Sequence, residues 1–358
     1  MNPEEHRACA GATVVTLLAI LAFCCIIAAA RAGTETHTTE AVAIAQSAAA
    51  SSKRRIPMNK WLKRGGITVL VLVGLGVAAV AIGAKLGERK MQRRIEVRLD
   101  PVPYRGDAAS IERGRYLYVS RNCAECHGVN GAGKDVVNDG KGLLIHAPNI
   151  TPAVGSAVAA YTALDWTRTI RHGVKPDGRP AIVMPSEDYA RFTDDDVAAV
   201  VAYVRQLPPA AGAGATIEFP LPVKALYAAG LVMDAAERID HSLAPAKPVP
   251  EAVTLEHGAY VANTCIGCHG EHLSGGKIPG APPDWPAAAN LTPGEGSALA
   301  HYPTADSLIA MFRSGKRPDG SAVSTVMPFA GLQAMNDTDV RALYLHLKSV
   351  PARPNGQR

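Results

Sequence analysis

The sequence contains one pattern twice, and this duplication constrains the fold more than any other feature. Residues 123–128 read CAECHG and residues 265–270 read CIGCHG, so each copy places a histidine directly after a pair of cysteines. Flanking residues also match: Asn149-Ile150-Thr151-Pro152 with Asn290-Leu291-Thr292-Pro293, Pro176-Asp177-Gly178 with Pro318-Asp319-Gly320, and Met184-Pro185 with Met327-Pro328. The period is far longer than the roughly 20 to 50 residues of solenoid repeats. It indicates that a whole domain is duplicated, and a chain of 358 residues has room for two.

Each copy ends in a segment with the apolar spacing of a helix. In residues 193–208, aliphatic side chains recur three or four positions apart, Thr193 can cap the start, and a proline ends the run. Residues 336–351 repeat this arrangement with Asn336 as the cap. We therefore predict a terminal helix in each copy.

Two further helices are predicted in each copy. The helix leading into the cysteines contains Gly114 or its counterpart Gly258, which costs about 1 kcal/mol relative to alanine. A close approach by the terminal helix would account for this residue. A middle helix ends at Gly173, or at Gly315 in the second copy. Strand signals are nearly absent, so we predict all-α domains, with one more helix within 224–239 of the linker.

Charge separates the N-terminal region from the rest. Residues 1–94 carry 13 Lys and Arg against 5 Asp and Glu, whereas residues 95–358 carry 24 against 27. The basic balance of the whole chain therefore does not indicate a nucleic-acid-binding surface on the repeated domains. Two apolar segments, 8–30 and 67–84, approach or exceed the roughly 20 residues that span a bilayer.

The apolar segment 67–84 has two interpretations. It is a retained anchor, which we favour, or a secretory signal with Ala79-Val80-Ala81 as its cleavage site. The preceding region is ambiguous in another way, because Met58 begins a basic stretch that looks like a fresh N-terminus. Residues 1–57 are therefore an N-terminal extension with an apolar segment at 8–30, or an extension of the gene model only.

The duplicated C-x-x-C-H pattern is the attachment motif of c-type haem. Two thiols hold the thioether links to the porphyrin, and the histidine is placed under the iron as its proximal ligand. A structural zinc site would join two cysteine pairs on one ion, but each pair here belongs to its own complete copy. A thioredoxin-type pair would need a surrounding βαβ unit, which is missing. We predict two covalently bound haem c groups, held by Cys123, Cys126, Cys265 and Cys268, with His127 and His269 on the iron.

Met184 and Met327 are the candidates for the distal iron ligand. Each precedes a proline at matched positions, in a loop ahead of the terminal helix. A thioether is a soft ligand that raises the haem potential and leaves no open coordination position. The other interpretation is that these methionines fill gaps in the core. The remaining methionines of the repeat region have no counterpart and are predicted to be core or surface residues: Met233, Met311 and Met335.

Several other polar residues are weaker candidates. Four histidines do not recur in the other copy and are interpreted as surface or packed residues: His146, His172, His301 and His346. Two matched pairs either support the haem edge or only shape the local chain: Asn149 with Asn290, and Tyr161 with Tyr302.

Together the motifs resemble those of class I cytochromes c. The succession RGRYL, CAECHG, PNITP, RHGV, PDGR, MP and TDDDV is similar to that in the cytochrome c subunits of membrane-bound alcohol, gluconate, aldehyde and nicotinate dehydrogenases. The resemblance covers residues 105–208 and 253–351. It implies that the motif cysteines attach the haem, that the motif histidines are the proximal iron ligands, and that Met184 and Met327 are the distal ones. It also implies attachment outside the cytoplasmic membrane, with residues after 84 in the periplasm. Those subunits usually carry three haem domains, whereas this chain has two.

We therefore predict an all-α protein with two tandem class I cytochrome c domains after an N-terminal transmembrane region. The predicted segments are an extension 1–57, an anchor or signal 58–94, a domain 105–208, a linker 209–250, a domain 251–351 and a tail 352–358. The predicted function is single-electron transfer at the cell inner membrane, without a reaction of its own. The donor would be a dehydrogenase or quinol-linked complex, and the acceptor a downstream protein such as a terminal oxidase. A di-haem peroxidase, with one iron open to peroxide, is the alternative; a redox or gas sensor would need a signalling domain.

Overall fold

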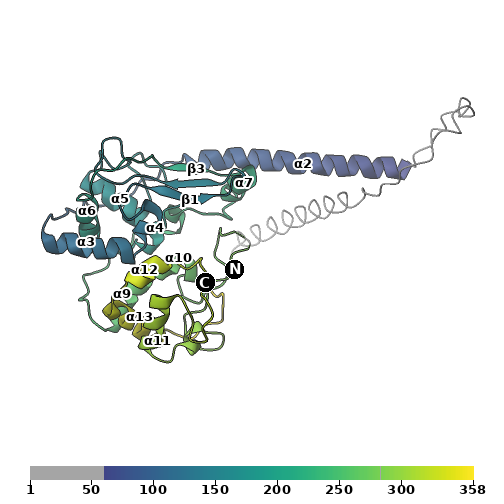
Figure 1. Ribbon diagram of the computed structural model, residues 1–358. Helices are drawn as coiled ribbons and strands as arrows, with labels where there is room; N and C mark the ends of the chain where they lie inside the picture. The colour runs from purple at the N-terminus through teal and green to yellow at the C-terminus, as the bar shows by residue number, and fades with distance from the viewer. Residues whose placement is uncertain (1–59, 283) are drawn as a thin grey trace, which may run out of the picture. The chain divides into compact units, whose positions relative to one another are not determined.

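The computed structural model describes residues 60–282 and 284–358 (Figure 1). The chain divides into two units, Met1–Ile82 and Gly83–Arg358. The N-terminal extension 1–57 and its apolar segment lie outside the described residues, so their interpretation stays a prediction. Both copies of the repeat belong to the second unit.

The helix α2 (Lys60–Met91) contains the whole apolar segment 67–84. Among the described residues, one helix is long and apolar enough to cross a membrane, and it covers Lys63–Met91 of this element. Its large aliphatic side chains between residues 67 and 82 are exposed. An apolar helix that is exposed all round is expected where lipid, rather than protein, covers it.

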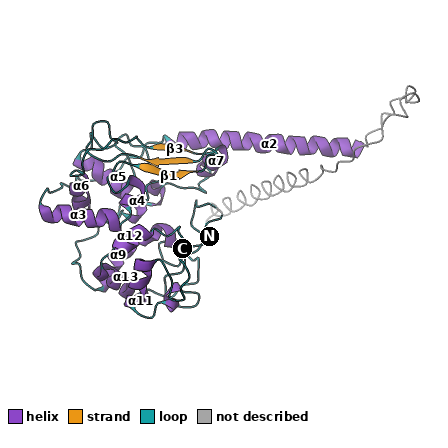
Figure 2. Cartoon of the chain, viewed as in Figure 1, coloured by secondary structure: helices purple, strands orange, loops and turns teal. Residues whose placement is uncertain are grey.

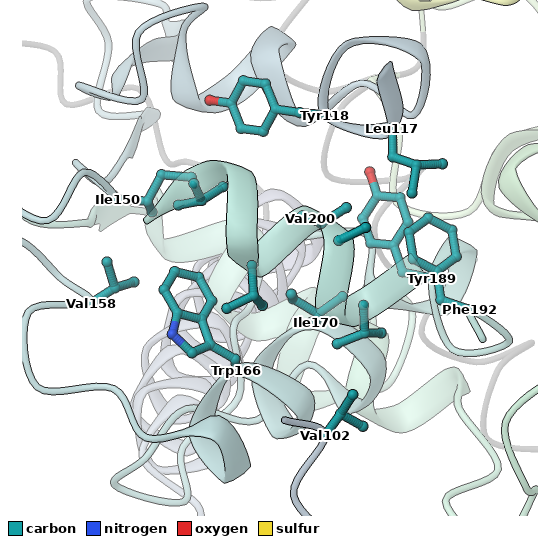
Figure 3. Close-up of a cluster of buried hydrophobic side chains, with 14 of the residues drawn as sticks. Val102, Leu117, Tyr118, Ile150, Val158, Trp166, Ile170, Tyr189, Phe192 and Val200 are labelled. Carbon is teal, nitrogen blue, oxygen red and sulfur yellow. The ribbon is translucent and has the colours of Figure 1, made fainter. Parts of the chain in front are cut away.

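The second unit is mostly helical and contains two separate hydrophobic cores (Figure 2). The first core is built by α3 (Ala108–Ser120), α4 (Cys123–His127), α5 (Ala163–His172), the 3-10 turn η1 (Ser186–Asp188) and α6 (Asp194–Val204). Figure 3 shows side chains of three of these helices in one cluster, among them Tyr118 of α3, Trp166 of α5 and Val200 of α6.

The second core repeats this plan. It is built by α9 (Leu255–Ala262), η2 (Asn263–Cys265), α10 (Ile266–His269), η3 (Ala298–His301), α11 (Ala305–Ser314), α12 (Phe329–Ala334) and α13 (Asp337–Ser349). The predicted caps are confirmed, because Thr193 and Asn336 each accept a hydrogen bond from the third residue of their terminal helix. The predicted stops of the middle helices are also confirmed: Gly173 and Gly315 are left-handed, with φ of 62° and 68°.

Glycine lets the first and terminal helices of each copy touch. A Cβ added at Gly114 would lie 1.9 Å from the carbonyl oxygen of Ala199, and one at Gly258 would lie 2.0 Å from that of Ala342. These separations are far below van der Waals contact, so no larger residue fits. The close approach predicted from the sequence is therefore observed in both copies.

A small sheet departs from the predicted all-α fold. Strands β1 (Lys134–Asn138), β2 (Leu144–Ala147) and β3 (Thr216–Glu218) pair in that order and are antiparallel, with Ile145 opposite Ile217. Four of the five residues of β1 are exposed, so the sequence has no alternating apolar signal there. The hairpin gains its third strand from the linker, a contact that local patterns do not report.

The predicted single linker helix is also wrong. The segment forms two shorter helices, α7 (Leu221–Ala228) and α8 (Ala235–Arg238). Gly230, with a φ of 74°, breaks the run between them. Asp234 then caps α8 by accepting a hydrogen bond from the backbone of Glu237.

Candidate functional site

The two cysteine motifs occupy corresponding places in the two cores. The first forms helix α4, and the second runs from η2 into α10. Cys123 packs against the first core and Cys265 against the second, and all four motif thiols are free. The turn after the first motif is fixed by the Tyr118 hydroxyl, which donates to the carbonyl of Gly128 at 2.6 Å.

The histidine of each motif is oriented by a backbone carbonyl. His127 Nδ1 lies 3.0 Å from the oxygen of Pro148, and His269 Nδ1 lies 2.8 Å from that of Ala289. A carbonyl can only accept, so Nδ1 carries the proton and Nε2 keeps its lone pair. Burial lowers the pKa of both imidazoles. Each histidine therefore presents a neutral nitrogen of the kind that ligates iron.

Burial disfavours the ionised form of the motif thiols. Burial raises the pKa of Cys123 and of Cys265 to about 12, so both are protonated at neutral pH. Reactive or metal-binding cysteines are thiolates, favoured by electropositive surroundings. In the described part of the chain, no three His, Cys, Asp or Glu side chains are grouped to hold a metal ion. The raised pKa of Cys123 and Cys265 disfavours the two alternatives that need thiolates, redox exchange and zinc binding.

The structure brings a methionine to the same core as each cysteine motif. Met184 and Cys123 both pack on the first core, and Met327 and Cys265 both pack on the second. Each methionine precedes a proline that caps the next turn, η1 or α12. In each copy the histidine and the methionine thus come from different elements that meet at one core.

A buried donor without a partner supports a haem in the first core. The Trp166 indole N–H is inaccessible to solvent and makes no hydrogen bond. Unsatisfied buried N–H groups are uncommon, and a haem carries propionate acceptors for such a donor. The donor set also fits: two thiols, a neutral imidazole and a thioether are the groups that bind haem c. Leu308 occupies the matching position of the second copy and is buried.

The matched asparagines shape turns. The side-chain oxygen of Asn149 accepts hydrogen bonds from the backbone N–H and the hydroxyl of Thr151, and its amide donates to the carbonyl of Ala210. Asn290 makes the same contacts, with Thr292 and the carbonyl of Arg353. Their hydrogen-bonding groups are thus used to tie the chain after each terminal helix to the turn. Tyr161 packs edge-on against Trp166, and its counterpart Tyr302 is buried in the second core.

The unmatched histidines contact residues outside the attachment motifs. His146 contacts the exposed Asp135 at 2.7 Å, and His172 Nδ1 lies 3.0 Å from Nδ1 of His241 in the linker. His301 lies in η3, and His346 lies on α13. Met311 and Met335 are buried in the second core, whereas Met233 is exposed, as predicted for core or surface residues.

Comparison with known proteins decides the family. The cytochrome c family model matches residues 111–208 and 256–351, together more than half of the chain. The chain belongs to the cytochrome c family. The two matched regions contain the two C-x-x-C-H motifs, and this cytochrome c therefore binds two covalent haem c groups.

Three relatives show where similar chains occur. The fructose dehydrogenase cytochrome subunit of Gluconobacter japonicus is 27% identical over 281 residues, which are 71% of this cytochrome and 55% of that subunit. The cytochrome c subunit of the quinone alcohol dehydrogenase of Gluconobacter oxydans is 28% identical over 70% of this chain and 57% of its own. A diheme cytochrome c-type protein of Cereibacter sphaeroides is 25% identical over 72% of this chain and 91% of its own. The chain thus spans little more than half of the two dehydrogenase subunits. These relatives indicate an electron-transfer protein.

The two cytochrome domains meet through a reciprocal pair of contacts that we call the Tyr–Asp clasps. Tyr116 of α3 donates to Asp339 at 2.5 Å and accepts from the backbone N–H of Asn336 at 3.1 Å. Tyr260 of α9 donates to Asp196 at 2.5 Å and accepts from that of Thr193 at 3.3 Å. Each tyrosine thus binds the N-terminus of the other domain's terminal helix, as in an interface with two-fold symmetry.

Each of these aspartates also contacts the first helix of its own domain, but the partner side chain differs between the two domains. Arg113 of α3 donates to Asp196 at 2.9 Å, and His257, at the matching position of α9, lies 2.7 Å from Asp339. The first domain adds Arg121, which donates across the interface to Asp339 at 2.6 Å. Burial would raise the pKa of Asp339, but its contacts with His257, Arg121 and Tyr116 hold it well below its usual range.

The clasps bring each methionine loop to the other domain's attachment motif. Asp188, four residues after Met184, accepts a hydrogen bond from the backbone N–H of Gly267 at 2.8 Å. At the matching position, Gly331 lies against Asn122, where an added Cβ would be 1.9 Å from the amide oxygen. These residues are not predicted from the sequence, because each looks like an ordinary polar or small residue. The clasps could have been found from one signal: Tyr116 matches Tyr260, and Asp196 matches Asp339, between the two copies.

Proposed function

We propose that this cytochrome is a membrane-anchored periplasmic carrier of single electrons. The donor is a dehydrogenase or quinol-linked complex, and the acceptor is a downstream protein such as a terminal oxidase. The proposal includes two tandem class I cytochrome c domains, 105–208 and 251–351, joined by the linker 209–250. Residues 58–94 form the anchor and 352–358 the tail.

The observation that carries the proposal is that a motif cysteine and a methionine pack on one core in each copy, Cys123 with Met184 and Cys265 with Met327. The donor set that we propose has four residues in each domain: Cys123, Cys126, His127 and Met184 in the first, and Cys265, Cys268, His269 and Met327 in the second. We assign thioether attachment to the cysteines, proximal ligation to the histidines and distal ligation to the methionines. A methionine at both irons leaves no position for a substrate, which favours electron transfer over peroxide chemistry.

The haem supplies a one-electron ferrous–ferric couple, and the chain determines its surroundings. The carbonyls of Pro148 and Ala289 fix the imidazole orientation. The aromatic and aliphatic cores exclude water, which limits the reorganisation that accompanies a change of charge. The Tyr–Asp clasps hold the two attachment motifs in one fixed relation.

Location and partners are proposed on separate grounds. The exposed apolar helix α2 supports an anchor, and the resemblance to cytochromes with haem attached outside the cytoplasmic membrane supports the periplasmic side. Relatives that are subunits of fructose and alcohol dehydrogenases support a dehydrogenase as donor. Because this chain spans little more than half of those subunits, its donor need not be the same enzyme.

The proposal is tested with membranes that contain the full-length protein. We expect covalent haem staining of the chain on a denaturing gel, reduced by half when Cys123 and Cys126, or Cys265 and Cys268, are both changed to alanine. The oxidised protein should show the methionine-to-iron band in the near infrared, and carbon monoxide should not change the reduced spectrum. Met184→Ala and Met327→Ala should each open one iron to carbon monoxide. A carbon monoxide shift in the unchanged protein would instead favour the di-haem peroxidase.

A further inference from the structure

The end of α2 is packed tightly against the linker helix α7, and both belong to the same unit. A Cβ added at Gly83 would lie 2.9 Å from Cβ of Ala225, and one at Gly87 would lie 2.2 Å from the carbonyl oxygen of Lys224. Two glycines one turn apart therefore allow α7 to lie directly on α2. Figure 1 shows α7 beside this end of α2.

Polar contacts fix α7 and α8 in this place. Lys90 donates to the carbonyl of Tyr227 at 2.8 Å, and Lys224 forms an ion pair with Glu88 at 2.8 Å. Arg93 pairs with the fully buried carboxylate of Asp234 at 2.8 Å. A buried ion pair of this kind is costly to break, so the linker is held firmly just beyond the apolar segment of α2.

This assembly leaves several large apolar side chains exposed. Five large side chains are exposed at the end of α2 and along 221–233, and we call them the α7 platform: Leu86, Leu221, Leu226, Leu231 and Met233. Leu221 and Leu231 are 55% and 61% exposed, although their neighbours Tyr227 and Asp234 are fully buried. Single exposed apolar residues are normal, but a group along one short segment indicates a surface that something covers.

We propose that the α7 platform lies in the headgroup layer of the lipid bilayer, with its leucines at the boundary of the acyl chains. The proposal rests on the proposed function in one respect, that α2 is a retained anchor. Its apolar segment 67–84 is about 27 Å long at roughly 1.5 Å per residue, close to the roughly 30 Å of a hydrocarbon core. Gly83 and Gly87 therefore lie at the membrane boundary, and α7 lies there with them. Arg89, and Lys85 with its exposed ion pair to Glu88 at 3.1 Å, provide charges for anionic headgroups at that level.

The test uses the full haem-loaded chain in vesicles of phosphatidylethanolamine and phosphatidylglycerol. With Cys9, Cys24 and Cys25 changed to serine, Leu226→Cys and Leu231→Cys are labelled with the fluorophore NBD. The matched control is Leu345→Cys on α13, a leucine of similar exposure in the second domain. We expect blue-shifted emission at both platform positions and quenching by lipids that carry a shallow spin label, with neither effect at the control. Comparing vesicles with and without the spin label removes any quenching by haem.

Alkaline extraction of the same vesicles reports on the anchor separately. If the chain resists extraction but the platform labels behave as in water, the platform proposal is wrong. Blue-shifted labels that the spin-labelled lipid does not quench would place another protein, or a second copy, on this surface and also overturn it. If the chain is extracted, the anchor proposal fails. Lipid quenching after the released protein is returned to vesicles would then still support the platform, and its absence would reject it.

Discussion

The two cytochrome domains share one plan but meet each other with unequal halves of an interface. Both clasps use a tyrosine of the first helix and an aspartate of the terminal helix. Asp339 is fully buried and faces the buried Arg121 from the other domain, whereas Asp196 faces Arg113, which also reaches Glu251 near the surface. Arg121 corresponds to Asn263, whose side chain bonds only to carbonyls of its own helix. Both contacts are therefore charged, but the charged groups are fully buried on one side and reach the surface on the other.

The largest expected effect comes from breaking that asymmetry. Asp339→Ala leaves the buried Arg121 without its partner and should lower the free energy of unfolding by about 3 to 5 kcal/mol. Asp196→Ala should cost less, about 1.5 to 3 kcal/mol, because Arg113 keeps Glu251 and water. Urea unfolding of the haem-loaded protein measures both. Asp306→Ala, which removes an exposed partner of Arg341, is the control and should cost at most about 1 kcal/mol. Equal losses for Asp339 and Asp196 would contradict the inequality of the two halves.

The helix contacts inside the domains should, in contrast, respond alike. Gly114→Ala and Gly258→Ala each push a Cβ into a backbone carbonyl of the terminal helix, at 1.9 and 2.0 Å. Overpacking of this kind costs about 1 to 3 kcal/mol or more, and the same measurement should give similar losses for both. Gly106→Ala, where nothing lies within 4 Å, is the matched control and should be nearly neutral. A large difference between the two glycines would show that the domains do not share this packing.

The sequence predicted the elements that local contacts determine and missed those that depend on distant contacts. Apolar spacing and capping residues predicted the terminal and middle helices, because those signals act within a few residues. The matched glycines predicted a helix contact, because a helical glycine has few other reasons to persist. The hairpin escaped prediction because β1 is exposed and its sheet is completed by β3, about 70 residues further along the chain.

The candidate site divides in the same way. The motif cysteines, histidines and methionines are candidates from the sequence because their order and chemistry are repeated, and their roles stay a prediction. Arg121, Asp188 and Gly331 were not, because each acts across the domain interface and none has an identical residue in the other copy. A local sequence pattern cannot assign a role to a residue that differs between the repeats. Such residues also determine how the two domains differ.

Acid should lower the stability of the first domain through His172, which has no counterpart in the second domain. Burial, together with His241 and Arg171, lowers the pKa of His172 to about 4, and the matching residue is Ser314. The unfolded state has a pKa of about 6.5 and gains a proton first. Stability should therefore fall as the pH drops from about 6.5 to 4 and stay level below that. His172→Asn should flatten this part of the profile in urea unfolding at several pH values. An unchanged slope would exclude His172 as its cause.

The smallest expected effect is a difference in potential between the two haems. Asp188 places a carboxyl group on the attachment motif of the second domain, whereas the matching residue against the first domain's motif is Gly331. A carboxylate favours the ferric state, so Asp188→Asn should raise the potential of the second haem by on the order of tens of millivolts. Burial and Glu187 raise the pKa of Asp188. The carboxyl group of Asp188 is therefore most ionised at high pH. The difference in haem potential between Asp188→Asn and the unchanged protein should widen as the pH rises.

A redox titration of the haem-loaded protein, resolved into two components, measures this shift. Asparagine keeps an oxygen that can accept the Gly267 N–H, so the loop geometry is preserved while the charge is lost. Asp306→Asn removes a carboxylate of the second domain that is exposed to water, and screening there should leave both potentials unchanged. Equal shifts at both haems would mean that Asp188 acts only through the net charge of the protein. A shift confined to the second haem would instead give the two repeats different potentials through one partly buried residue, and with them a preferred order of reduction.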